Sequence, residues 1–545
     1  MSVSHPVPRL LPTFLLVAAA AAQSSWSGPK AHPPAAIETI TKKELLTHAT
    51  FLASDDLQGR LTGSPGQAAA ARYIAAHFER LGLEPLGDEL PDGGGRSYLQ
   101  HYGIKRTYVA EGSALTIGGD VLRTGYAVLG ARQMDVDVRG TLRFCGFGRT
   151  RGARRDLEEG EDLRGRIAVV ALKAPRGRVG KDLTVEQKFG MSFGVLGRLG
   201  RTARNLTRAG AEAVLFLQHE DRIGLSDVLN YVAVAPGKAR VEANFPGADA
   251  GMGGFGQLGS GGKGVTMVLS VPASQKVLAR LGIDPAAYGE FLAGGERPAA
   301  ADEVDAEVQL KVVHDEHARA SNVVAVLRGR DPELAEQAVV YSAHMDHVGV
   351  RMDGDVFNGA DDNASGSAGL LAIASAYAGA GQRPRRSVVF LSVSGEELGL
   401  WGSQYFSDHP TWPLDKLVAD LNTDMIGRSG PESGPHEVTV TPSFRHAKYS
   451  TIVRDAARFG EALGMKFTSG DKYYMRSDHY NFARKGIPVV FFCNGEHEDY
   501  HQVTDHADKL DGDKMQRIAR LAFWTGWHVA NADEPPRNLG RQERW

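Results

Sequence analysis

The chain has 545 residues, of which 42% are hydrophobic and 23% charged, a composition ordinary for a soluble globular protein of about two to four domains. Its formal net charge of −3 excludes a global preference for nucleic acid or anionic membranes. The two cysteines, Cys145 and Cys493, fall in different predicted domains, so we expect two buried thiols rather than a disulfide.

The N-terminus carries a short apolar run. Arg9 precedes residues 10–22, which read LLPTFLLVAAAAA and end in small side chains. The run is shorter than the ~20 residues that a membrane-spanning helix needs, so it predicts a secretory signal peptide over residues 1–22. We therefore expect an exported protein, periplasmic or extracellular, with no stable membrane insertion once the signal is removed.

Two helices are predicted next, in a first domain segment over residues 37–104. They are ELLTHATFLASDDLQGR (44–60) and SPGQAAAARYIAAHFERLGLEP (64–85), with a short Gly/Ser/Pro loop between them. In the second segment, apolar residues recur at helical spacing and form one face. Ser64 and Pro65 suit its start, and Gly82 suits its end.

The sequence pattern changes over residues 105–303, where short segments with alternating apolar and polar residues predict strands. Examples are SALTIGG, GTLRFCGFG and GRIAVVALKAP, together with one helix-then-strand unit, RTARNLTRAGAEAVLFLQ. The basic residues between Arg149 and Arg166 are interleaved with Asp and Glu, which favours an ordinary solvated face. No catalytic cluster stands out in this β-rich region.

From residue 304 to 532 the pattern becomes βαβ, followed by a tail over 533–545. Apolar runs SNVVAVL, QAVVYSA, SVVFLSV, LVADLNT and IPVVFF alternate with helices such as ASGSAGLLAIASAYAGA. Strands that are apolar throughout predict a largely parallel sheet covered on both faces, in an α/β fold. Ligands in such sheets bind beyond the carboxyl ends of the strands.

Histidines and acids gather just after these predicted strands. They are His344, Asp346 and His347 after the second run, Glu396 and Glu397 after the third, Asp424 after the fourth, and Glu496, His497, Glu498, Asp499, Tyr500, His501, Asp505 and His506 after the fifth. Asp361 and Asp362 precede the small-residue helix. Each has an ordinary alternative role, such as a helix cap, a turn residue or a solvated surface pair.

Together these residues predict a metal site. Crowded carboxylates repel one another and need cations to remain charged. His and carboxylate ligands without thiolate suit zinc, with manganese or cobalt as substitutes, and the surplus of acids suits two ions with a bridging carboxylate. Asp346, two residues after His344, is placed to accept that histidine's second ring N–H.

The motifs SAHMDHVG, NGADDNASG, SGEELGLWGS, LNTDMIG and DYHQVTD, in this order, resemble those of the M28 zinc exopeptidases. The resemblance extends from about Ile37 to Ala530. It implies a phosphorylase/hydrolase-like αβα sandwich with a mixed, mostly parallel sheet. The middle section, with DLRGRIAVV and AGAEAVLFL, resembles an inserted protease-associated (PA) domain of β-rich structure.

The resemblance also implies roles for individual residues. His344 and Asp424 would bind one zinc, Glu397 and His501 the other, and Asp362 would bridge the two ions. Glu396 would be the general base, and Tyr500 would stabilise the oxyanion.

The resemblance favours an aminopeptidase acting on peptides, and other readings stay open. A carboxypeptidase or dipeptidase would use a cation such as Arg476 for the terminal carboxylate, although an arginine in a loop commonly pairs with a nearby acid. A glutaminyl cyclase would use one zinc, and a binding module none. Nucleic acid is not an expected partner, and the oligomeric state is open.

Overall fold

The structure is a computed structural model that describes residues 32–91, 93–130, 133–152, 155–172, 185–219, 225, 229, 232–248, 264–301 and 303–545, with the backbone alone over 185–193. Residues Pro34–Trp545 form one unit by their contacts. The predicted signal peptide lies outside the described residues. Within the described ranges, no helix is both long and apolar enough to cross a membrane.

The predicted βαβ region forms a mixed sheet, which confirms the α/β class. β13, β14, β15 and β18 run parallel at its centre. Antiparallel pairs join β1, β2 and β14 to β12, and β16 to β18, whereas β17 pairs parallel with β16, so the sheet is mixed with a parallel centre. Besides β2, the strands are β1 (Glu84–Pro85), β12 (Arg319–Leu327), β13 (Ala338–His344), β14 (Ser387–Val393), β15 (Leu417–Thr423), β16 (Glu437–Thr441), β17 (Lys466–Ser469) and β18 (Val489–Cys493).

Helices cover both faces of this sheet because its strands are apolar on both sides. In β12, Val323 and Ala325 pack into one core with α1, α2, α7, α9 and α11, while Val324 and Val326 pack into a second core with α8 and α10. The helices are α1 (Lys42–Leu52), α2 (Pro65–Arg80), α7 (Gly366–Ala378), α8 (Trp401–Asp408), α9 (Thr451–Ala462), α10 (His479–Ala483) and α11 (Gly512–Asn531). Short helical turns are η1 (Ala35–Thr39), η2 (Asp55–Arg60), η4 (Leu334–Glu336), η5 (Ala360–Ser365), η6 (Leu414–Lys416), η7 (Asp471–Tyr473) and η8 (Ala507–Lys509).

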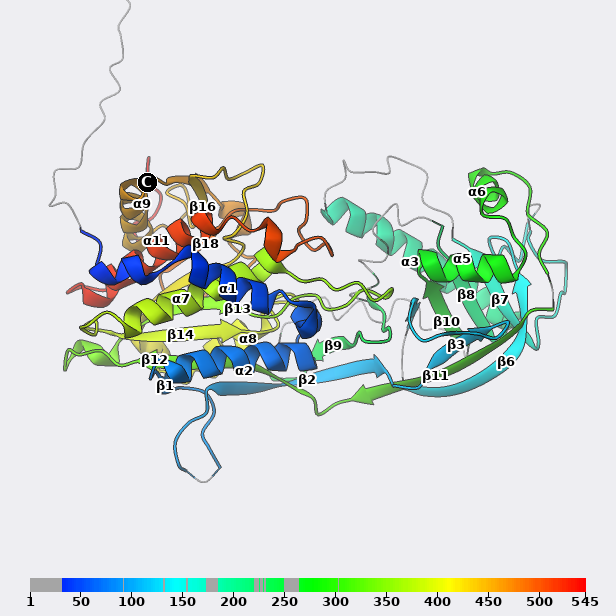
Figure 1. Cartoon of the computed structure of the whole chain (residues 1–545), viewed down its shortest axis with the longest axis horizontal. Coiled ribbons are helices and arrows are strands. Elements are labelled where there is room, and N and C mark those ends of the chain that lie inside the picture. Colours follow the sequence, from blue (N-terminus) through cyan, green and yellow to red (C-terminus); the bar gives the residue numbers. More distant parts are fainter. Residues whose placement is uncertain are drawn as a thin grey trace, which may run out of the picture. The chain divides into compact units, whose positions relative to one another are not determined.

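A second set of strands is built mainly from the predicted insert. β2 (Leu99–Val109) pairs with β12 at its start and with β9 and β11 at its end, so it belongs to both sheets (Figure 1). The other elements are β3 (Ala114–Ile117), β4 (Asp120–Leu122), β5 (Tyr126–Val128), β6 (Met134–Phe144), β7 (Arg166–Ala171), α3 (Val185–Arg208), β8 (Ala213–Leu217), β9 (Arg240–Ala243), β10 (Val265–Leu269), α5 (Val271–Arg280), α6 (Pro285–Ala293) and β11 (Asp305–Asp315). Domain boundaries at 104 and 303 stay predictions.

The first predicted helix ends earlier than expected, whereas the second begins as expected. Ser64 caps α2 by accepting a hydrogen bond from the Gln67 amide. In contrast, α1 ends at Leu52, and the DDLQGR segment forms the turn η2, in which Gln58, Gly59 and Arg60 all have positive φ. Helical spacing alone could not reveal this break, because contacts far along the chain hold the turn.

Gly59 has a packing reason to be glycine. A Cβ at this position would lie 2.3 Å from the Gly349 carbonyl oxygen and 2.5 Å from that of Phe357. The Gly59 carbonyl also accepts a hydrogen bond from the Gly349 amide. The left-handed turn therefore brings its backbone directly against the segment that follows β13.

Gly59→Ala is expected to lower the free energy of unfolding by about 3 kcal/mol or more, because it adds a backbone clash to the cost of positive φ. Gly82→Ala is the matched control, since Gly82 has φ +69° and open space around its Cβ position. It should cost about 1 kcal/mol. Urea unfolding of both variants measures the difference, and equal midpoints would contradict this account of Gly59.

Candidate metal centre

The predicted site residues follow the carboxyl ends of the parallel strands. His344 is the last residue of β13, Asp424 directly follows β15, and Glu396 and Glu397 lie in the turn after β14. Asp362 lies in η5, and His501 lies in the loop after β18. Because neighbouring parallel strands end at one edge of a sheet, their loops converge there.

These residues form two adjacent groups. In the first, His344 Nε2 lies 3.3 Å from Asp424 Oδ1 and 3.9 Å from Glu396 Oε2. In the second, His501 Nε2 lies 2.9 Å from Glu397 Oε2. Each group has the residue types and the spacing that could hold a metal ion.

Asp362 stands between the two groups. Its Oδ1 lies 3.4 Å from His344 Nε2, and its Oδ2 lies 3.1 Å from His501 Nε2. One carboxylate thus faces both groups with a different oxygen, the arrangement that a bridging ligand needs. Its neighbour Asp361 instead faces His497, whose Nε2 lies 3.2 Å from Asp361 Oδ2.

The buried ligand atoms fit a cation. His344 Nε2, Asp362 Oδ2 and Asp424 Oδ1 are buried and make no hydrogen bond. Buried polar atoms without a partner are costly, so their convergence on one place indicates a ligand that supplies positive charge. Imidazole and carboxylate donors without thiolate match zinc.

Burial and neighbouring charge set the protonation of these groups. Burial raises the pKa of Glu396 well above its ordinary value, and the nearby Asp424 and Glu397 carboxylates add to the rise. Burial also raises the pKa of Glu397, but His501 and His347 outweigh it and hold that pKa at about 2. The adjacent glutamates therefore differ: Glu397 stays ionised beside imidazoles, while Glu396 holds a proton more readily.

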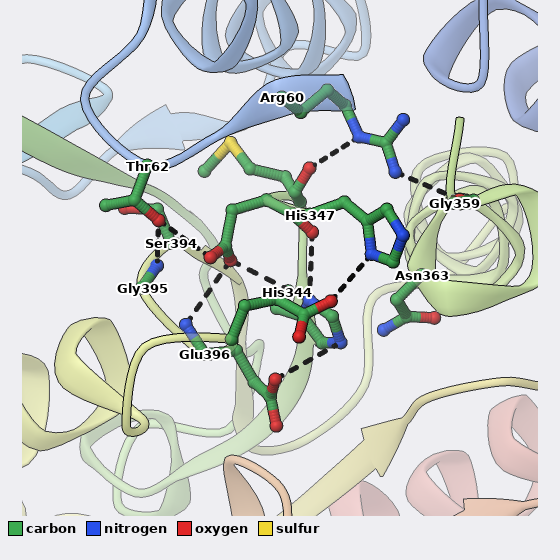
Figure 2. Close-up of polar contacts among 12 residues, drawn as sticks. Arg60, Thr62, His344, His347, Gly359, Asn363, Ser394, Gly395 and Glu396 are labelled. Atoms are coloured by element: carbon green, nitrogen blue, oxygen red, sulfur yellow. Dashed lines mark hydrogen bonds and ion pairs between the residues drawn. The ribbon is translucent and has the colours of Figure 1, made fainter. Parts of the chain in front are cut away.

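Asp346 makes different contacts from the one expected. His344 Nδ1 lies 3.2 Å from the Asp346 main-chain oxygen, whereas the nearest carboxylate oxygen is 3.7 Å away, too far for a hydrogen bond. The carboxylate instead accepts from the Thr62 hydroxyl at 2.7 Å and from the Glu396 amide at 3.3 Å. Thr62 also accepts from the Gly395 amide, so this chain of contacts fixes the turn that carries both glutamates (Figure 2).

His347 belongs to the site although sequence reasoning gave it no role. Its Nδ1 lies 2.6 Å from Glu397 Oε1, and its Nε2 is buried without a hydrogen-bond partner. It is grouped with Asp362, Glu397 and His501 by the spacing of their ligand atoms. Its position three residues after His344 could have identified it from the sequence. Sequence spacing alone, however, does not distinguish a metal ligand from a residue that orients a ligand.

Arg60 is a second residue that sequence reasoning missed. Its buried guanidinium donates to the main-chain oxygen of Gly359 at 3.0 Å (Figure 2). It also donates to the main-chain oxygens of Met345 at 2.8 Å, Asn358 at 2.7 Å and Leu52. Burial lowers its pKa to about 10 against the opposing effect of nearby carboxylates, so it stays charged at neutral pH. Arg60 thus ties the loop after His344 to the segment before Asp362.

Tyr500 and Arg476 lie at the cleft beside the two groups. This open cleft is lined by Asp362, Glu396, Asp424, Met425, Tyr473, Arg476, Phe491, Cys493, Gly495, Glu496 and Tyr500. Arg476 pairs with Glu496 at 2.8 Å, the alternative contact expected for it. Cys493 and Cys145 are buried free thiols, as expected.

The insert reaches the metal-site loop through Lys238. Its buried Nζ donates to the main-chain oxygen of Val348, the residue after His347. Met352, from the same loop, packs into a core of the insert, and its carbonyl accepts from the Gly125 amide. The loop between His347 and Asp362 is therefore held on both sides, by Arg60 and by the insert.

Comparison with known proteins gives related results for the second half of the chain. Residues 322–525 match Peptidase family M28. A probable zinc metalloprotease of Pyricularia oryzae is 31% identical over 267 residues, which are 40% of this chain and 51% of that protein. A probable leucine aminopeptidase of Arthroderma otae is 28% identical over 215 residues, 38% of this chain and 58% of that protein.

The chain spans about half the length of the curated relatives it matches. Among solved structures, a zinc aminopeptidase from Bacillus subtilis aligns over 91% of this chain and 96% of its own, with TM-score 0.51 and 18% identity, a likeness of fold. Residues 322–525 therefore resemble peptidase family M28, and the two relatives are a probable zinc metalloprotease and a probable leucine aminopeptidase.

Proposed function

We propose that this protein is an exported aminopeptidase that removes N-terminal residues from peptides with the help of two zinc ions. The observation that carries the proposal is Asp362, whose two oxygens face two separate groups of imidazole and carboxylate donors. The family match adds that a peptidase site is expected at these strand ends. Export rests on the apolar N-terminal run.

The residues divide naturally between two ions. His344 and Asp424 would hold one, Glu397 and His501 the other, and Asp362 would be shared. Mn²⁺ or Co²⁺ could substitute for zinc at such nitrogen and oxygen donors. His347, hydrogen-bonded to Glu397, orients that ligand or joins it.

Glu396 suits the role of general base. When bound, the zinc ions lower the pKa of a shared water and polarise the peptide carbonyl. Glu396 would take the proton of that water and give it to the leaving amine. Its main-chain amide is tied to Asp346, and its raised pKa leaves it able to hold a proton between the two steps.

Tyr500 suits stabilisation of the developing oxyanion. It lines the same cleft as Glu396, and its ring stacks on His501 with centroids 4.0 Å apart. Burial raises its pKa well above the ordinary value, and the nearby Asp362 and Glu397 add to this, so the hydroxyl keeps its proton and can donate. A donor placed at the cleft favours charge that develops on the substrate oxygen.

The charge of the cleft favours a substrate with a free amine. Glu496 and Asp424 line it together with Glu396, and the cation Arg476 is paired with Glu496. The lining of this cleft holds more carboxyl groups than cations, which suits a protonated N-terminus better than a C-terminal carboxylate, and Arg476 is already occupied by Glu496. This supports an aminopeptidase over a carboxypeptidase.

We also propose that the insert, with its resemblance to a PA domain, is held fixed against the loop that bears His347 rather than acting as a mobile lid. Lys238 and Met352 connect it to the loop that bears His347. Tyr102, of β2, and Phe245 pack edge to face with centroids 5.7 Å apart, a further contact between the two regions. An element fixed at several points would support this loop without needing to open.

Glu396→Gln should keep both metal ions and lower kcat by about 10²–10⁴-fold, because it removes the base and leaves the ligands in place. Glu397→Ala should instead lose metal. Metal content by atomic absorption and turnover of an aminoacyl amide separate the two effects. Near-normal turnover by Glu396→Gln would remove it from this role.

Substrates that differ only at their ends test the aminopeptidase assignment. Free dipeptides and aminoacyl amides should be hydrolysed, N-acetylated analogues should not, and a chelator should abolish turnover until zinc is restored. Hydrolysis of the blocked substrates alone would overturn the assignment. Two zinc ions per chain are expected. One zinc ion per chain, together with cyclisation of N-terminal glutamine, would indicate a cyclase. A chain that binds no zinc would indicate a binding module.

A further inference from the structure

Helix α3 (Val185–Arg208) has two opposite faces over the part whose side chains the structure describes. One face packs into a core of the insert through Val195, Leu196, Leu199, Ala203 and Leu206. The other carries Arg198, Arg201, Arg204 and Arg208, of which Arg204 is half-buried and the others are exposed. We call these four residues the arginine face.

The four arginines lie close together because of their spacing. Steps of three, three and four residues keep them within an arc of about 120° on a helix that turns about 100° per residue. Neighbours at such spacing are about 5–6 Å apart at Cβ, and like charges there destabilise a helix. Helix stability alone therefore does not account for the arrangement.

None of the four makes an ion pair or a hydrogen bond with its side chain among the residues that the structure describes. Arg198 and Arg201 lie back along the helix instead, each 3.8 Å from the place where a Cβ on Gly194 or Gly197 would be. Among the other exposed arginines of this region, Arg139 pairs with Glu307, Arg164 with Asp162 and Arg280 with Asp120, whereas the separate Arg123 and Arg151 make no ion pair with a described residue.

The sequence around α3 shows the same segregation of charge. Residues 173–208 contain nine Lys or Arg and two Asp or Glu, a net charge of +7 in a chain whose total is −3. The other residues together therefore carry −10. The nearly neutral net charge of the whole chain therefore includes one strongly basic segment. Such a segment would orient the protein in the electric field of an anionic surface.

We propose that the arginine face binds the phosphate groups of an anionic lipid surface, with α3 lying along it. The face extends about 15 Å between Arg198 and Arg208, and the opposite side of the helix is packed into the core, so α3 offers a shallow line of cations. The large hydrophobic side chains exposed in the described residues, such as Phe51 and Met475, lie outside α3. Binding to the lipid surface would therefore be electrostatic, with no apolar side chain inserted into the bilayer. The arginine face also has no aromatic side chain on which nucleic-acid bases could stack.

Binding of this kind is weak and reversible. Each cation near an anionic bilayer adds about a fivefold gain in partitioning, and salt removes it because the Debye length falls to about 3 Å at 1 M. The proposal is independent of the peptidase assignment. It would hold the enzyme near a membrane without any spanning segment.

Co-sedimentation of the full chain with vesicles tests the proposal. The protein should bind phosphatidylcholine vesicles that contain about a third phosphatidylglycerol, and not pure phosphatidylcholine, and about 0.5 M salt should release it. Joint replacement Arg198→Gln, Arg201→Gln and Arg204→Gln should weaken binding about a hundredfold. Replacement of the same three residues by Lys should retain most of it.

The matched control removes the same net charge from paired positions: Arg139→Gln, Arg164→Gln and Arg280→Gln. This variant should bind vesicles like the original chain, and both triple-Gln variants should keep full peptide hydrolysis in solution. Equal weakening by the control, no preference for anionic vesicles, or binding of duplex DNA without vesicle binding would each overturn the proposal.

Discussion

Four carboxyl groups, those of Asp362, Glu396, Glu397 and Asp424, crowd around the His344 and His501 imidazoles at one edge of the sheet. Their mutual repulsion in a desolvated place opposes folding unless cations lie nearby. Arg60 supplies one permanent charge from the protein itself. Because its donors are used on main-chain oxygens rather than on the carboxylates, it stabilises the loops without occupying the ligands.

The unusual backbone at residues 58–60 places Arg60 where its guanidinium can reach these main-chain oxygens. Arg60 must approach the site from beneath the loop after β13, and three successive residues with positive φ turn the chain to bring it there. Gly59 allows the turn to pass against Gly349 and Phe357. The strain of this turn is offset by four hydrogen bonds from one guanidinium, so strain and function lie at the same place.

Local patterns were enough to predict the centre of the fold and most of the site. β14 and β15 have the expected bounds, because apolar runs of strand length end where polar residues begin. The turn after β14 does bring Glu396 and Glu397 to one place while giving them different surroundings. By contrast, Arg60 and Thr62 contact residues about 285 positions away, and no local pattern encodes such contacts.

The separation of acidic and basic residues along the chain is a further property that the net charge does not reveal. The chain has a net charge of −3, and its acids cluster at the strand ends. Its arginines cluster on α3, where they form no ion pair with a described acid. Both arrangements cost stability through like-charge repulsion. At the strand ends, imidazoles and Arg60 offset that cost, and the grouped side chains could hold metal. On α3 no acid among the described residues offsets it, and the anionic lipid surface proposed above would do so.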